Sequence, residues 1–382
     1  MHKTFWFQLH WLFGVIFGLF LILVGVSGAV LSYEKEILRF LNNKTYFVEV
    51  PQDKKALLEK EILEFYQEKN PDIKINSISF SSQKDASVSL NIVKEGERKG
   101  VMVYLNPYTA EVLPEIIGKD FFMFFFSLHR WLTFEGDYRS IGKNIVAITT
   151  IVCIFLTIGG IIVYWPQIKK NFLSSLQFSF RYKKRAFLSS SHSAIGLWVV
   201  PFFLVMCLTG LYWSYDWYRA GMYSVLKVEA PKRGAIPNKQ QDNPLNLQDI
   251  QKAVDIFKAN IDKEYKNANI RLSTSKSNIF TISYLYKDST HFRETNSMEI
   301  DIKEDRVIKN SKFEDKKLNE KIMSSMLPLH SGEYFGWFGQ FAMFISSLFM
   351  AFFVITGYML YYDRWKKKKE KFLKNMNSLR KD

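Results

Sequence analysis

Cysteine is scarce in this chain of 382 residues, which contains only Cys153 and Cys207. Both lie inside long apolar stretches, so we expect no disulfide framework, no CxxCH motif and no cysteine-based metal site. A buried cysteine usually acts as a small apolar packing residue. The chain also lacks a Gly/Ser linker and low-complexity tracts.

Acidic residues are too few to balance the basic ones, and the formal net charge is +15 at pH 7. Most of the excess lies beside apolar stretches, in segment 166–191 and in segment 363–382, which holds nine basic and three acidic residues. This is the positive-inside pattern of a membrane protein. We therefore expect membrane lipids and no nucleic acid as partners, with both basic segments and both termini in the cytoplasm.

Four apolar stretches are each long enough to cross a bilayer, because about 20 apolar residues span its hydrocarbon core. We expect spans at about 9–33, 141–165, 192–215 and 337–362. The first of them resembles a secretory signal, but its apolar run is longer, and the same pattern recurs in mid-chain. We therefore interpret it as a transmembrane helix.

Two polar segments separate the spans, 34–117 and 216–327. In each, a stretch with helical apolar spacing (DKKALLEKEILEFYQEKN, LQDIQKAVDIFKANI) precedes alternating, strand-like stretches such as KINSISF and IFTISYLY. We predict two small α+β modules outside the membrane. Since both termini are expected inside, both modules are expected in the periplasm.

The predicted organisation can be written along the whole chain. It comprises a first transmembrane helix at 1–33, an α+β module at 34–117, an amphiphilic approach and second helix at 118–165, a basic cytoplasmic loop at 166–191, a third helix at 192–215, a second module at 216–327, a fourth helix at 328–362 and a basic cytoplasmic tail at 363–382.

An internal repeat connects the first and third spans. A shift of 182 positions places His10 on His192 and Gly14 on Gly196. A shift of 197 positions relates the other two spans, among others through Gly160 and Gly357. The repeat predicts an all-α membrane four-helix bundle built from two tandem repeats.

Four of the six histidines flank the predicted spans. His10 and His192 are expected near the cytoplasmic ends of the first and third spans, and His129 and His330 near the outer ends of the second and fourth. A single histidine at a helix end is usually an interfacial residue, but duplicated positions favour function. Two neutral imidazoles from opposite helices can hold a haem from both faces inside a bundle.

Gly14 and Gly196 each follow a histidine by four residues and share its helix face. They either make room for a flat macrocycle or allow close helix packing. Arg130 is a candidate partner for a haem propionate, with membrane anchoring as the alternative.

The outer pair fits the repeat less regularly. His129 precedes Gly142 by thirteen residues, whereas His330 precedes Gly339 by nine. A slip of four residues is about one helical turn. It either preserves the direction of the side chain or places His129 on a separate interfacial helix.

The motifs HWLFG, SLHRWL, SHSAIGLW and LPLHSGEYFGWFG, with the turn NPYTAEV, resemble the PepSY-associated transmembrane proteins, the PiuB/FoxB-like inner-membrane group. The resemblance covers essentially the whole chain. It implies a bacterial inner-membrane oxidoreductase with two b-type haems, or one, that reduces ferric siderophores at the periplasmic face for iron uptake. It carries over as haem-iron ligands His10, His129, His192 and His330.

This reading requires a separate electron donor, either cytoplasmic or a quinol, because the chain shows no flavin domain. Other functions stay open. A haem-free PepSY protein could bind a ligand or regulate a peptidase, and internal repeats also occur in transporters. A reductase of this type could act on copper or a quinone instead of a siderophore.

Overall fold

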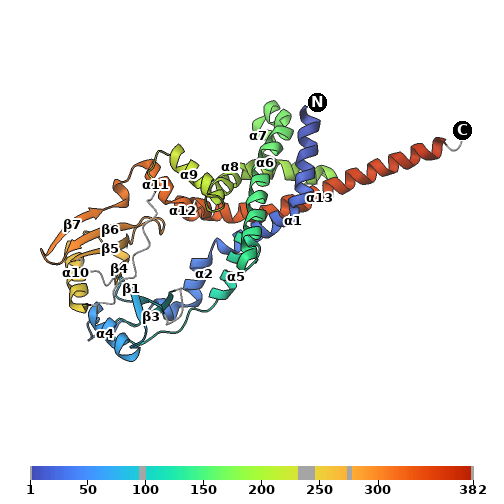
Figure 1. Cartoon of the computed structure of the whole chain (residues 1–382). Helices are drawn as coiled ribbons and strands as arrows, with labels where there is room; N and C mark the ends of the chain where they lie inside the picture. The colour runs from blue at the N-terminus through green and yellow to red at the C-terminus, as the bar shows by residue number, and fades with distance from the viewer. Residues whose placement is uncertain (1, 94–99, 231–245, 273–277, 380–382) are drawn as a thin grey trace. The chain divides into compact units, whose positions relative to one another are not determined.

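The computed structural model describes residues 2–93, 100–230, 246–272 and 278–379. The chain divides into two compact units, drawn in Figure 1, which we call the helical unit and the strand unit. The helical unit comprises Met1–Glu34, Asp120–Val225 and Met326–Asp382, and the strand unit comprises Lys35–Lys119 and Leu226–Ser325.

Four helices in the described part of the chain are long and apolar enough to cross a membrane. They are α1 (His2–Leu31), α6 (Arg139–Lys170), α8 (Lys184–Gly210) and α13 (Gly336–Leu379). Helix α1 contacts α6 and α13, and α8 contacts the same two helices, so the four form a bundle. Shorter elements complete the unit: α5 (Lys119–Trp131), α7 (Phe172–Ser175), α9 (Asp216–Val225), α12 (Met326–Ser331) and the 3-10 turns η1 (Gly136–Tyr138), η2 (Leu211–Trp213) and η4 (Glu333–Phe335).

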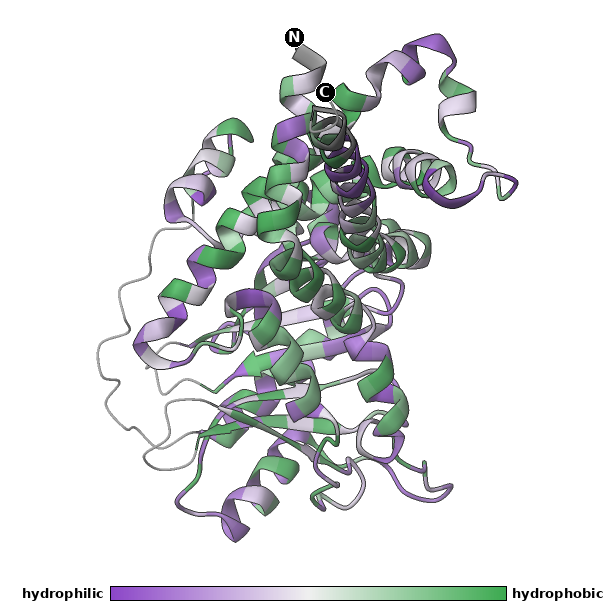
Figure 2. Cartoon of the chain, turned by 90° about the vertical axis from the view of Figure 1, so that its right-hand side faces the viewer, coloured by the Kyte–Doolittle hydropathy of each residue, from purple (hydrophilic) through white to green (hydrophobic). Residues whose placement is uncertain are grey.

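The helices differ from the predicted segments at several ends. Helix α13 has 44 residues, about 66 Å of helix, more than twice the thickness of a hydrocarbon core. Its part near the C-terminus is hydrophilic (Figure 2). Residues 216–225, expected to begin the second module, instead form α9 in the helical unit, where the Tyr218 hydroxyl donates to the Leu208 carbonyl.

The strand unit contains one antiparallel sheet of seven strands in the order β3-β2-β1-β4-β5-β6-β7. Its helices α4 (Glu59–Lys69) and α10 (Leu247–Asn260) fall within the stretches that show helical apolar spacing. The strands are β1 (Lys74–Phe80), β2 (Val88–Val93), β3 (Val101–Leu105), β4 (Tyr265–Arg271), β5 (Ile279–Tyr286), β6 (Asn296–Asp301) and β7 (Arg306–Ser311), and the remaining elements are α2 (Glu34–Leu41), α3 (Asn43–Tyr46), α11 (Leu318–Ser324) and η3 (Phe313–Asp315).

The expectation of two separate modules needs correction, because both polar segments contribute to this single sheet. Strand β1 pairs antiparallel with β4, and Ile78 lies opposite Ile270 in this register. Both side chains are fully buried. If the segments folded apart, β1 and β4 would each be an exposed edge strand with an apolar face, and pairing them removes both edges.

One hydrophobic core spans the two halves of the sheet and the helices α4 and α10, which contact each other. A polar cluster joins these helices as well. Lys258 Nζ lies 2.6 Å from Glu59 Oε1, and the Lys60 backbone N–H donates to Gln251 Oε1. Glu59 and Gln251 are buried, and these hydrogen bonds satisfy groups that would otherwise be costly to bury.

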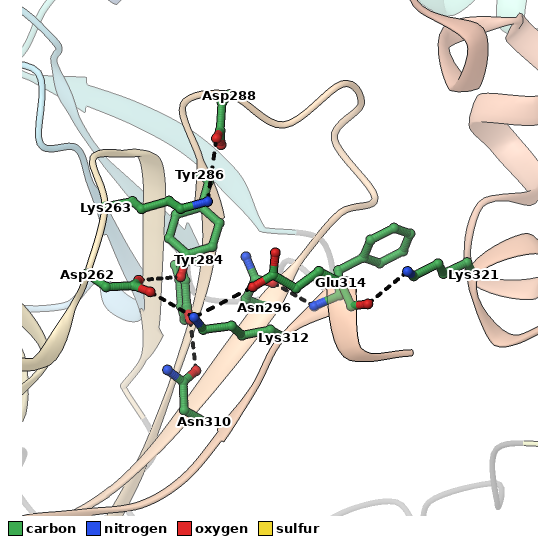
Figure 3. A network of polar contacts seen from close by, with 11 residues as sticks. Asp262, Lys263, Tyr284, Tyr286, Asp288, Asn296, Asn310, Lys312, Glu314 and Lys321 are labelled. Atoms are coloured by element: carbon green, nitrogen blue, oxygen red, sulfur yellow. Dashed lines mark hydrogen bonds and ion pairs between the residues drawn. The ribbon is translucent and has the colours of Figure 1, made fainter. Parts of the chain in front are cut away.

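A polar network joins the ends of three strand segments in this sheet (Figure 3). Asp262, which precedes β4, accepts a hydrogen bond from the hydroxyl of Tyr286 on β5 at 2.6 Å. Its other carboxylate oxygen lies 2.7 Å from Nζ of Lys312, which follows β7. Lys312 and then Tyr286 lower the pKa of Asp262 to about 2. The carboxylate raises the pKa of Lys312 in turn.

We expect Asp262→Asn to destabilise the strand unit by less than about 1 kcal/mol at pH 7, because the carboxylate is half exposed. An unfolded aspartate has a pKa of about 3.9, so this stabilisation is complete above that pH and is lost as the pH falls through the folded pKa of about 2. Chemical unfolding of the full chain in detergent between pH 7 and pH 2.5 measures it. Asp288→Asn, which removes a looser pair with Lys263, is the control, and an equal pH dependence in both variants would contradict the assignment.

Candidate functional site

Four histidines of the helical unit form two close pairs. His10 lies in the first third of α1 and His192 in the first third of α8, with their ring centroids 6.4 Å apart. His129 lies near the end of α5 and His330 near the end of α12, with their centroids 6.1 Å apart. The structure thus brings together the two pairs that the sequence repeat predicts.

Both separations suit two imidazoles on opposite sides of one metal ion. A histidine nitrogen binds a metal at about 2 Å and lies about 1.1 Å from its ring centroid, so two such rings have centroids roughly 6 Å apart. Ordinary edge-to-face ring packing gives a similar separation. The hydrogen bonds of the rings therefore have to distinguish ligation from packing.

The rings of His129 and His330 are each held at Nδ1 by a backbone carbonyl of another helix. His129 Nδ1 lies 2.9 Å from the oxygen of Val24 on α1. His330 Nδ1 lies 2.9 Å from the oxygen of Met206 on α8. A carbonyl only accepts, so Nδ1 must carry the proton in both rings, and Nε2 keeps a free lone pair.

Hydroxyl groups add a second acceptor at the same nitrogens. Ser27 Oγ lies 3.3 Å from Nδ1 of His129, and Thr209 Oγ1 lies 3.0 Å from Nδ1 of His330. Each hydroxyl donates its own proton to the carbonyl four residues earlier in its helix, at 2.5 Å. The hydroxyl oxygens therefore present a lone pair to the histidine.

The His10–His192 pair is held less evenly. His192 Nδ1 lies 2.8 Å from Thr356 Oγ1, and this hydroxyl donates to the carbonyl of Phe352. His10 Nδ1 is buried and faces the backbone carbonyl of Leu156, but no bond of good hydrogen-bond geometry forms there within the described residues. In the same described residues, none of the four rings has a hydrogen-bond partner at Nε2.

Nδ1 held by a carbonyl or hydroxyl and Nε2 left open is the usual arrangement of a metal-binding histidine, since the second hydrogen bond fixes the tautomer and orients the ring. A histidine that served only to fill space would gain nothing from an unpaired nitrogen. The donor set therefore fits a metal held by two neutral imidazoles.

Each histidine lies against a glycine of a neighbouring helix. A Cβ placed on Gly28 would be 3.0 Å from Cε1 of His129, and one on Gly210 would be 3.2 Å from Cε1 of His330. Gly160 and Gly357 approach the other two rings more loosely, at 3.4 and 4.0 Å. At His129 and His330 the missing side chain lets the ring reach the carbonyl of the previous helical turn.

The residue before each glycine repeats as well. These two-residue steps are Ser27–Gly28 at His129, Thr209–Gly210 at His330, Thr356–Gly357 at His192 and Gly159–Gly160 at His10. The sequence analysis did not predict that these residues contact the histidine rings. The repeat carried the signal, because the shift of 182 relates Ser27 to Thr209 and the shift of 197 relates Gly159 to Thr356.

A cavity of about 890 Å³ opens beside His10 and His192, within the range of about 300–1,000 Å³ typical of cofactor sites. Gly14 and Gly196 line it. A Cβ on Gly14 would meet no atom within 4 Å, and one on Gly196 would meet only Phe353. The space at Gly14 thus belongs to the cavity and not to a close helix contact. Three basic side chains also line the cavity: Arg185, Arg364 and Lys368.

The other two histidines lie on short helices that precede the spans. Leu132 and Thr133 have positive φ and end α5, whereas Gly332 and Gly336 have positive φ and separate α12 from α13. The predicted fourth helix at 328–362 is therefore divided at these glycines. The four-residue slip lies mainly in the two connections, which differ in length, so both rings keep equivalent surroundings.

Arg130 lies beside His129 but over aromatic rings. Its guanidinium carbon is 5.6 Å from the ring centroids of both Phe126 and Trp131. Arg139 lies closer to the same Trp131 ring, at 3.9 Å. These cation–π contacts anchor both arginines in the described structure, and the cofactor contact predicted for Arg130 stays a prediction.

An apolar cluster in the bundle contains one buried residue from each span: Leu21, Cys153, Cys207 and Val354. Leu21, Cys153 and Val354 also line the cavity beside His10 and His192. The pairs are well separated along the helices. His10 lies 14 residues before Val24, whose carbonyl holds His129, and this spacing is about 21 Å of helix.

The family model of the PepSY-associated TM region matches residues 7–364, nearly the whole chain. The chain belongs to this family. The resemblance inferred from the sequence motifs is thereby confirmed. The match and the four apolar helices make this PepSY-associated protein a multi-pass membrane protein. A comparison with curated proteins finds none that matches it.

We expect Gly28→Ala to destabilise this PepSY-associated protein by about 1–3 kcal/mol, because the new methyl group crowds the His129 ring. Gly14→Ala is the matched control on the same helix, and its methyl group meets open space. Thermal unfolding in detergent of both variants, prepared without added cofactor, measures the difference. Equal losses of stability would contradict the close approach of His129 to α1.

Proposed function

We propose that this protein is a haem b membrane protein that passes electrons from a cytoplasmic or quinol donor across the membrane to a periplasmic ferric siderophore. The observation that carries the proposal is the pair of histidine pairs with ligand spacing, Nδ1 held in three of four rings and Nε2 open in all four.

Haem held by these histidines would supply a one-electron iron couple. Histidine side chains of the chain itself would hold each haem. His10 and His192 would hold one haem, and His129 and His330 the other. Gly14 and Gly196 leave room beside the first pair.

The basic side chains of the cavity suit the carboxylates of a haem. Arg185, Arg364 and Lys368 line the same space as His10 and His192. Charged hydrogen bonds between such cations and propionates are stronger than neutral ones. The cations also lie in the basic segments that the positive-inside rule assigns to the cytoplasm, which supports an orientation with this pair on the donor side.

The acceptor is proposed from the family resemblance and from coordination chemistry. Siderophores hold Fe(III) with hard oxygen donors, and these bind Fe(II) less well. Adding one electron to the ferric complex therefore weakens its hold on iron. With a bacterial inner-membrane location, the strand unit would face the periplasm and share the compartment of the ferric complex.

We expect purified protein from haem-replete cells to show the sharp reduced α-bands of b haem, with two haems per chain by pyridine haemochrome. His10→Ala and His192→Ala should each lose one haem, and His129→Ala and His330→Ala the other, because each haem would be held by both rings of its pair. His291→Asn, in the strand unit, is the control and should keep both. A colourless wild-type protein would sink the proposal and favour a haem-free PepSY binding or regulatory protein.

The acceptor is tested by mixing dithionite-reduced protein, freed of excess dithionite, with a ferric hydroxamate siderophore in a stopped-flow instrument. We expect the reduced α-bands to decay while a ferrous chelator captures iron in a one-to-one ratio with the electrons lost. The His330→Ala variant should transfer at least tenfold more slowly, because the proposed outlet is missing. Stable reduced bands in wild-type protein would refute the siderophore as acceptor while leaving haem binding intact.

A further inference from the structure

The four histidines differ in whether a hydroxyl group accepts a hydrogen bond from Nδ1, and the sequence repeat shows which residue stands at that place. At three of them a Ser or Thr hydroxyl accepts from Nδ1, at 3.3 Å from Ser27, 3.0 Å from Thr209 and 2.8 Å from Thr356. At the equivalent place beside His10 stands Gly159, which carries no hydroxyl. The buried Nδ1 of His10 faces the backbone carbonyl of Leu156 without a bond of good hydrogen-bond geometry in the described residues.

We propose that Ser27, Thr209 and Thr356 are positioning residues that set the redox potential of the two sites, and that Gly159 raises the potential of the His10–His192 site above that of the His129–His330 site. The inference rests on the proposed haem binding and extends it. It assigns a role to the chain's own second-sphere residues.

The sign follows from ligand basicity. A hydrogen bond from Nδ1–H makes the imidazole a more basic ligand. A more basic ligand stabilises Fe(III) relative to Fe(II) and so lowers the reduction potential. His129 and His330 each have a carbonyl and a hydroxyl as acceptors. His192 has one hydroxyl, whereas His10 faces the Leu156 carbonyl and has Gly159 where the other rings have a hydroxyl.

The fold has room to reverse the difference at Gly159. A Cβ placed there would be 3.8 Å from His10 Nδ1 and 3.6 Å from the Trp6 ring, which are ordinary contacts. A serine at this position carries its hydroxyl one bond further and brings it within hydrogen-bond reach of Nδ1. Helical serine can also donate its proton to the carbonyl of the previous turn, as Ser27 does.

The test is a potentiometric titration of the full-length protein with both haems bound, followed at the reduced α-bands. We expect Gly159→Ser to lower the potential of one of the two components, while the other stays fixed as an internal reference. Gly159→Ala is the matched control, since it adds the same Cβ without an acceptor, and it should leave both potentials unchanged.

Thr356→Val gives an independent readout in the opposite direction. Removing the hydroxyl that holds His192 should raise the potential of the same component, and Thr356→Ser should restore it. Because these variants keep all four histidines, haem content in each should equal that of the wild type.

Two results overturn the inference, and they are distinguishable. If Gly159→Ser and Gly159→Ala titrate alike while both retain two haems, the second-sphere hydroxyls do not set the potentials, although the proposed function stands. If the wild-type protein binds no haem, the proposed function and this inference fall together.

Discussion

The helical unit depends on burying imidazole rings among apolar helices without leaving their N–H groups unsatisfied. Inside a membrane no water is available to accept such a hydrogen bond, and an unmet polar group costs several kcal/mol. The chain solves this at His129 and His330 with backbone carbonyls of α1 and α8. The same hydrogen bonds fix the tautomer and thereby determine that Nε2 is the nitrogen open to a metal.

A helix carbonyl is normally occupied by its own helix, and the glycine steps explain how it can accept a second donor. A carbonyl oxygen has two lone pairs, but side chains of the next turn usually cover the free one. Gly28 and Gly210 remove that cover, because each follows by four residues the carbonyl that accepts from a histidine. The preceding Ser or Thr donates into its own helix and offers its oxygen to the ring, so the two-residue step acts as one receptor for Nδ1–H.

The sequence predicted the four spans and the partners within each histidine pair, because apolar runs and repeat shifts depend on local patterns. It did not predict the single sheet, since nothing local in β1 or β4 indicates which edge each will meet. It placed His330 on the fourth span, whereas α12 is separated from α13 by the positive-φ glycines Gly332 and Gly336. Most of the groups that accept hydrogen bonds from the histidine rings could not be predicted either, because backbone carbonyls such as that of Val24 have no signature in the amino-acid sequence.

Both histidine pairs, one strand pair of the sheet and one helix contact of the strand unit join the first half of the chain to the second. His10 meets His192, His129 meets His330, β1 pairs with β4, and α4 contacts α10. Half of the chain would thus hold two single histidines and expose the apolar edge of a three- or four-stranded sheet. Neither histidine pair can form in such a half, and neither can the core that spans the sheet junction. The two halves therefore fold as one unit, and the repeat between them breaks at Gly159, whose counterpart Thr356 holds His192.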